Sequence, residues 1–165
     1  MRAVNQQVAD EALTWGWMHW VGLASWPEII AWADGWIMQL EQWPNELTEI
    51  SLYARARDAD MSQALRDLSR AGRPEEAAKL LVGRMLARLD AGDNPHELIY
   101  RLCQLSQTKF ERPYVFLPDN LSDAIYALEL HSESIDPEYG WLKRDAATDT
   151  LWLRQEAYRI LSGLI

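Results

Sequence analysis

The sequence predicts an all-α protein, a single irregular bundle of about seven or eight helices with a Trp-rich N-terminal core. Two observations carry this prediction. Apolar residues recur at helical spacings of three and four along most of the chain, and Pro, Gly and capping residues separate the segments. In addition, seven of the nine tryptophans fall within residues 13–52, and side chains of that size are expected to lie mostly in the interior.

The first two predicted helices hold most of the tryptophan. Their inward positions are Leu13, Trp17, Trp20 and Ala24 in the first helix and Ile29, Ala33, Trp36, Ile37 and Leu40 in the second. Ser25 and Glu28 have the spacing of a capping box, and Pro27 suits a first helical turn because it needs no hydrogen-bond acceptor there. The second helix is therefore expected to begin at this point.

Four more helices follow, each bounded by proline, glycine or a capping residue. The expected ranges are 44–57, 60–72, 74–92 and 95–107. Asp60 is the expected N-cap of the second of these, and Gly72 and Gly92 are expected to end the second and third. The breaks at Pro44, Pro74 and Pro95 are unevenly spaced, so no repeat architecture is predicted.

The C-terminal third is expected to hold two helices. Residues 109–120 contain both phenylalanines and two prolines, and they are expected to form an extended, partly buried connector. A helix follows from about Asn120 to Asp136, with Leu121, Ile125 and Leu128 facing inward. After a loop around Gly140, a last helix is expected from about Thr150.

Length and composition predict one domain. With 165 residues, of which 48% are hydrophobic, residues 1–165 are expected to form a single helical domain. The sequence has no apolar run of about eighteen residues and no signal-peptide pattern, so we expect a cytoplasmic protein of bacterial type and no membrane partner. Cys103 is the only cysteine, which excludes an intramolecular disulfide and a cysteine metal cluster.

No catalytic motif is present. His19, His96 and His131 are scattered, and none accompanies a nucleophile signature. The Glu-x-x-His pairs of bundle metal sites and the glycine-rich loops of nucleotide sites are also missing from the sequence. We therefore expect no enzyme, no cofactor and no metal ligand.

The charge distribution indicates a different kind of function. The net charge is −9, and residues 119–149 carry eight acids against Lys143 and Arg144. Such a balance argues against nucleic acid as a partner. It fits either ordinary solubility or a docking surface for a basic protein, in which aromatic side chains supply binding energy. The candidate partner-binding residues are Asp119, Asp123, Tyr126, Glu129, Glu133, Asp136, Glu138, Tyr139 and Trp141.

One stretch of the second and third predicted helices also resembles known proteins. The pattern consists of Trp32, Ala33, Asp34, Ile37, Leu40, Pro44, Leu47, Glu49, Ser51 and Leu52. It resembles a stretch of small helical bacterial proteins, some of which look like immunity proteins of toxin systems such as contact-dependent growth inhibition. The resemblance covers about a quarter of the chain and implies a helical fold.

Together these observations predict an immunity protein that occludes a basic, nuclease-type toxin. Nucleases attract phosphate with Lys and Arg, and a carboxylate-rich protein can occupy the same electrostatic field. The alternative is a non-catalytic adaptor or regulatory module that binds a protein or an apolar ligand through its Trp-rich helices.

Overall fold

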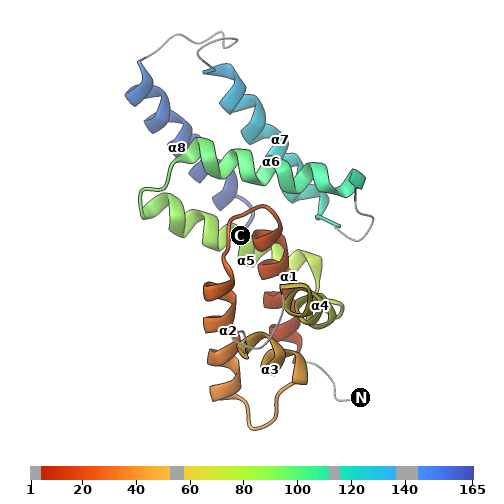
Figure 1. The fold of residues 1–165 in the computed structure, drawn as a ribbon. Helices are drawn as coiled ribbons and strands as arrows, with labels where there is room; N and C mark the ends of the chain where they lie inside the picture. Colours follow the sequence, from red (N-terminus) through yellow and green to blue (C-terminus); the bar gives the residue numbers. More distant parts are fainter. Residues whose placement is uncertain (1–4, 53–57, 112–115, 137–144) are drawn as a thin grey trace. The chain divides into compact units, whose positions relative to one another are not determined.

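The computed structural model describes residues 5–52, 58–111, 116–136 and 145–165, with the backbone alone at 108–111. These residues form eight α-helices and no strand (Figure 1). The predicted all-α class is therefore confirmed. The chain divides into two compact units, residues 1–77 and 78–165, and the boundary falls within the fifth helix.

The first unit is built mainly from four helices. They are α1 (Gln6–Trp20), α2 (Trp26–Gln39), α3 (Asn45–Ser51) and α4 (Asp58–Ser69). Helix α1 packs most extensively on α4, while α3 packs on both α2 and α4. The beginning of α5 (Pro74–Asp90) completes the unit up to residue 77.

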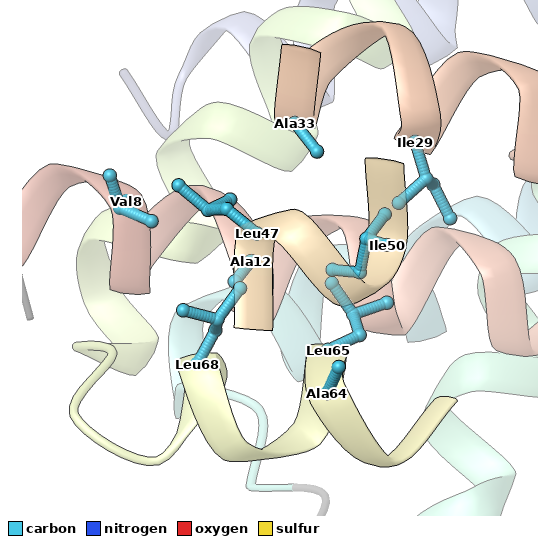
Figure 2. Close-up of a cluster of buried hydrophobic side chains, with 9 residues drawn as sticks. All are labelled: Val8, Ala12, Ile29, Ala33, Leu47, Ile50, Ala64, Leu65 and Leu68. Atoms are coloured by element: carbon cyan, nitrogen blue, oxygen red, sulfur yellow. The ribbon is translucent and has the colours of Figure 1, made fainter. Parts of the chain in front are cut away.

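Small and medium aliphatic side chains fill the interior of this unit. Its core cluster is Val8, Ala12, Ile29, Ala33, Leu47, Ile50, Ala64, Leu65 and Leu68 (Figure 2). In Figure 2, helices α1, α2, α3 and α4 each direct apolar side chains toward this centre. The four helices therefore share one core, and its burial drives their association.

The tryptophans surround this core and do not fill it, contrary to the expected Trp-rich core. Among the tryptophans that the structure describes, Trp17 alone is fully buried, with 4% of its surface exposed. Trp20 and Trp43 are exposed, and the half-buried ones that pack against the cluster are Trp15, Trp26, Trp32 and Trp36. An indole edge that carries an N–H donor is better placed at a rim, where polar partners are available.

The turn between α1 and α2 follows two local rules, of which the sequence prediction used one. The Ser25 N–H and hydroxyl both donate to the Glu28 carboxylate, at 2.7 and 2.8 Å, as the predicted capping box requires. Helix α1, however, ends at Trp20, so Ala24 is buried as expected but does not belong to this helix. Gly22 has a φ of 75° and ends the helix in a Schellman turn, in which the Leu23 N–H donates to the Met18 carbonyl.

The second unit contains the remainder of α5 together with three long helices. They are α6 (Pro95–Glu111), α7 (Asp119–Ser134) and α8 (Ala146–Ser162), and all three pairs among them are in contact. Helix α5 ends as predicted at Gly92, whose φ is 93°, and the Asp93 N–H closes another Schellman turn on the Arg88 carbonyl.

Several helix limits differ from the prediction. Helix α4 begins at Asp58, which places Asp60 inside its first turn, where it is not the N-cap. Helix α6 continues through Glu111 into the expected connector, and α8 begins at Ala146, four residues before Thr150. Residues 53–57 and Gly140, which belong to a predicted helix and a predicted loop, lie outside the described residues.

Candidate protein-binding surface

One side of α7 carries acidic and apolar side chains in a continuous row. Asp119, Asp123, Tyr126, Leu130 and Glu133 are all exposed, and their spacing of four, three, four and three residues keeps them on one side of the helix. We call these five residues the α7 stripe. The opposite side of α7 is buried through Leu121, Ala124, Ile125 and Leu128.

The three carboxylates of the α7 stripe lie apart from the ion pairs formed among the described residues. Among the described residues, the Asp119, Asp123 and Glu133 side chains have no cationic partner. Between them lie Tyr126 and Leu130, which are 60% and 41% exposed. The α7 stripe thus combines exposed negative charge with apolar area, the two properties of a surface that attracts and then holds a basic protein.

The remaining predicted site residues are distributed differently. Glu129 is half-buried on the flank of α7, and Asp136 is half-buried just beyond the helix end. Glu138, Tyr139 and Trp141 lie outside the described residues. The structure therefore brings together four of the predicted residues, namely Asp119, Asp123, Tyr126 and Glu133, on one exposed row.

Two other acids of region 119–149 have local roles. Asp145 is the N-cap of α8, and its carboxylate accepts hydrogen bonds from the Thr148 N–H and hydroxyl. These bonds lower the pKa of Asp145. Asp149 is buried in the first turn of α8, so its expected place on the acidic surface is wrong. The positively polarised start of a helix is a favourable environment for both carboxylates.

Leu130 is the member of the α7 stripe that the sequence reasoning missed. Its apolar character alone does not distinguish it from the inward positions of α7. Spacing along the helix gives a better indication of exposure, since Leu130 follows the exposed Tyr126 by four residues. The buried positions of α7 are Leu121, Ile125 and Leu128. Helical phase therefore places Leu130 beside Tyr126 on the exposed side.

The buried Cys103 is not prepared to act as a nucleophile. Desolvation by burial, followed by the negative charges of Glu129 and Glu133, raises the pKa of the Cys103 thiol to about 12. A reactive cysteine needs a thiolate, which a lowered pKa provides. Cys103 thus serves as a small core residue of α6.

Two of the histidines take part in packing. His19 packs against Trp26 with ring centroids 4.3 Å apart and ring planes tilted by 43°. Burial lowers the pKa of His19, while Asp58 acts in the opposite direction. His131 stacks on Trp152, and its Nε2 lies 3.3 Å from a Glu156 carboxylate oxygen on α8. His96 lies in the first turn of α6, as expected.

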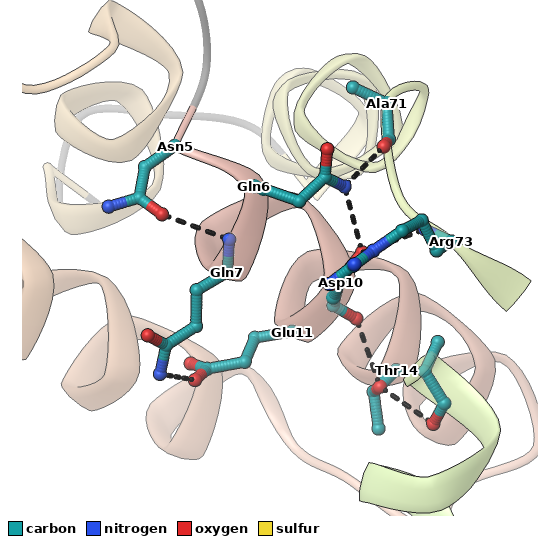
Figure 3. A network of polar contacts seen from close by, with 9 residues as sticks. Asn5, Gln6, Gln7, Asp10, Glu11, Thr14, Ala71 and Arg73 are labelled. Atoms are coloured by element: carbon teal, nitrogen blue, oxygen red, sulfur yellow. Dashed lines mark hydrogen bonds and ion pairs between the residues drawn. The ribbon is translucent and has the colours of Figure 1, made fainter. Parts of the chain in front are cut away.

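The strongest polar network in the first unit has a structural role. The buried Asp10 carboxylate pairs with the Arg73 guanidinium at 2.5 Å and also accepts the Arg73 backbone N–H and the Gln6 amide (Figure 3). Burial alone would raise the pKa of Asp10, but these bonds together lower it. Thr14 adds a bond to the Ala77 carbonyl, so the network fastens α1 to the segment around the start of α5.

The described residues contain neither a metal-binding group nor a helix that could span a membrane. No three His, Cys, Asp or Glu side chains there are grouped to hold a metal ion. No helix of the described chain is both long enough and apolar enough to cross a membrane. Comparison with protein-family models, curated proteins and solved structures found no match to this chain.

Proposed function

We propose that this chain is a non-catalytic binding protein that occludes a basic protein partner through the α7 stripe. The observation that supports the proposal is the exposed row of Asp119, Asp123 and Glu133 around Tyr126 and Leu130. Carboxylates accelerate the approach of a basic surface, and a central aromatic side chain slows its release. We do not propose nucleic acid as a partner, because its phosphates would be repelled.

Within this class we propose an immunity protein of a bacterial toxin system, acting in the cytoplasm on a nuclease-type toxin. A nuclease concentrates positive charge where it binds phosphate, and the α7 stripe offers carboxylates to that charge. Inhibition would then be steric and electrostatic, with no bond made or broken. The sequence resemblance of residues 32–52 supports the same assignment.

The test uses the purified full chain and the protein encoded by the neighbouring gene. We expect tight binding that abolishes the toxic activity of the neighbour. The variant D123K/E133K should reduce the association rate by about tenfold at an ionic strength of about 0.01 M, and by less at about 0.15 M, because salt screens the attraction. Y126A should mainly increase the dissociation rate. Surface plasmon resonance measures both rates.

A matched control separates the α7 stripe from net charge. E49K/D90K makes the same change in charge at two exposed positions on α3 and α5. Its association rate should stay within about twofold of the unmodified chain, because steering depends on where the charge lies. Equal effects of the two double variants would contradict a docking role for the α7 stripe.

The alternative function, an adaptor, is supported by the incomplete burial of apolar side chains on α2. Helix α2 is strongly apolar, yet several of its side chains are only half-buried: Trp26, Ile30, Trp32, Trp36 and Ile37. An adaptor that binds a partner through this helix would keep its affinity in D123K/E133K. It would lose affinity when α2 is altered, which the same binding assay distinguishes.

A further inference from the structure

The Glu11 carboxylate accepts hydrogen bonds from two tryptophan side chains of the first unit. Glu11 on α1 accepts hydrogen bonds at one oxygen, Oε2, from the indole N–H groups of Trp32 and Trp36, at 2.6 and 2.9 Å. Its other oxygen, Oε1, accepts the Gln7 side-chain amide at 3.1 Å (Figure 3). All three donors are neutral, so the negative charge of Glu11 has no cationic partner among the described residues.

Three indole rings surround this charge. Trp32 and Trp36 are held by Glu11 itself, and Trp15, one turn after Glu11 on α1, lies against Trp32 with ring centroids 6.4 Å apart. Each of the three residues is half-buried, so part of each remains accessible. The faces of aromatic rings are electronegative and attract cations.

The local charge points to the kind of group that fits here. Residues 5–52 contain seven acids and neither Lys nor Arg. A carboxylate offers about four lone-pair directions, of which the hydrogen bonds from Gln7, Trp32 and Trp36 use three. The fourth lies on Oε1, beside the exposed bond to Gln7. A planar guanidinium can donate an N–H to that oxygen while its face rests on an indole, which a compact ammonium group cannot do equally well.

We propose that Glu11, Trp15, Trp32 and Trp36 form a binding site for an arginine side chain of a protein partner. The hydrogen bonds to Glu11 fix the orientations of Trp32 and Trp36 before binding, which reduces the entropy lost on association. The site belongs to the first unit and involves no residue of the α7 stripe. An experiment can therefore confirm or reject this site independently of the proposed function.

The experiment titrates the full chain with acetyl-Leu-Arg-Leu-amide and follows the indole N–H resonances of Trp32 and Trp36 by NMR. The matched peptide acetyl-Leu-citrulline-Leu-amide has the same shape without the positive charge. We expect saturable shifts with the arginine peptide and at least about tenfold weaker binding of the citrulline peptide, in line with the strength of a charge-assisted bond. Guanidinium ion alone serves as the third probe and should bind more weakly than the arginine peptide.

Variants identify the groups responsible. E11Q removes the charge but keeps an acceptor for the indole N–H groups. It should lower the affinity for the arginine peptide by about tenfold. W15L keeps apolar bulk without an aromatic face and should also weaken binding. E49Q makes the same chemical change as E11Q at an exposed position on α3 and should bind like the unmodified chain. Circular dichroism verifies that each variant is folded.

Three outcomes would overturn the proposal. Equal affinity for the arginine and citrulline peptides would show that charge plays no part in recognition. Equal affinity for guanidinium ion and the arginine peptide would assign the site to a free cation, and the protein partner would be wrong. Retained affinity in both folded variants, E11Q and W15L, would place the peptide elsewhere on the chain.

Discussion

Gly72 occupies a position in the first unit where a side chain has no room. A Cβ atom at this residue would lie 2.7 Å from the Ala9 carbonyl oxygen and 3.0 Å from the Leu13 Cβ on α1. Both atoms belong to a packed helix, so relief requires the backbone to move. We predict that Gly72→Ala lowers the free energy of unfolding by about 1–3 kcal/mol, as overpacking does elsewhere. Urea denaturation measures the change.

Gly35→Ala is the control for this substitution. Gly35 lies inside α2, and no atom lies within 4 Å of the position that its Cβ would occupy. Alanine is the better helix former, so this change should stabilise the chain by about 0.5–1 kcal/mol. A loss of stability at Gly35 similar to that at Gly72 would contradict the steric explanation.

Individual residues were predictable where a local rule determines their role. Ser25 and Glu28 cap α2 because three residues separate them, and that spacing is visible in the sequence. The burial of Asp149 was not predictable in the same way, since it depends on where α8 begins. The contact of Glu11 with Trp32 depends on the packing of two helices, which no local pattern specifies.

At the level of elements, one arginine of α8 completes the end of α5. The Arg154 guanidinium donates to the carbonyl oxygens of Leu89, Gly92 and Asp93, at 2.5, 3.3 and 3.0 Å. These carbonyls lie at the C-terminal end of α5, where no further N–H groups of the helix are available as donors and a positive charge is favourable. We predict that Arg154→Met lowers the free energy of unfolding by about 1–3 kcal/mol, because the carbonyls lose their donors. Urea denaturation measures the loss.

Arg159→Met on the same helix is the matched control. Arg159 forms an ion pair with Glu156 at 2.7 Å, but 65% of its side chain is exposed. An exposed pair contributes at most about 1 kcal/mol. The Arg154 variant should therefore be the less stable of the two, and the reverse order would show that the end of α5 is satisfied without Arg154.

Recognised glycines and capping residues did not always mark a helix end: Asp60, the expected N-cap, lies inside the first turn of α4, which ends at Ser69, before Gly72. The end of α5 was placed correctly through Gly92, whereas α1 was extended to Ala24 because Gly22 was not read as a terminator. The connector expected over residues 109–120 was placed too early, because helix α6 continues through Glu111. Residues 116–118 are non-helical, as expected, and residues 112–115 lie outside the described residues.

For the molecule as a whole, the fold class followed from helical periodicity and the breaks between the periodic segments. The composition of the core did not, because a count of tryptophans does not show whether they lie inside a core or at its rim. The tryptophans Trp32 and Trp36 donate hydrogen bonds to a half-buried carboxylate, and the aliphatic cluster occupies the centre. The size and hydrophobicity of tryptophan predicted that these side chains would be buried. They are only half-buried because each indole N–H needs a hydrogen-bond acceptor, which is available at the rim of the core.

Acid sensitivity is a property of the whole chain. The pKa values of Asp10 and Glu156 are lowered in the folded state, chiefly because Arg73 and Arg159 donate hydrogen bonds that outweigh the effect of burial. Their unfolded pKa values are higher, so unfolding takes up protons in acid. The stability they contribute is complete above about pH 5 and is lost as pH falls through the lowered pKa values. Urea denaturation from about pH 7 to pH 3 should show this decline.

The variant Asp10→Asn tests the origin of that decline. It should be less stable than the unmodified chain near pH 7, because a buried pair loses its charge. Its stability should then change less between about pH 5 and pH 3, because one of the titrating groups is gone. An unchanged pH dependence would exclude Asp10 as a source of the acid sensitivity.

The sharing of Glu11 by two indoles has a consequence for sequence variation. Trp32 and Trp36 lie one turn apart on α2 and depend on the same oxygen atom. A chain that replaces Glu11 with an apolar residue leaves two donors without an acceptor, so a compensating change at only one tryptophan is insufficient. In homologous chains we therefore expect positions 11, 32 and 36 to vary as a set of three.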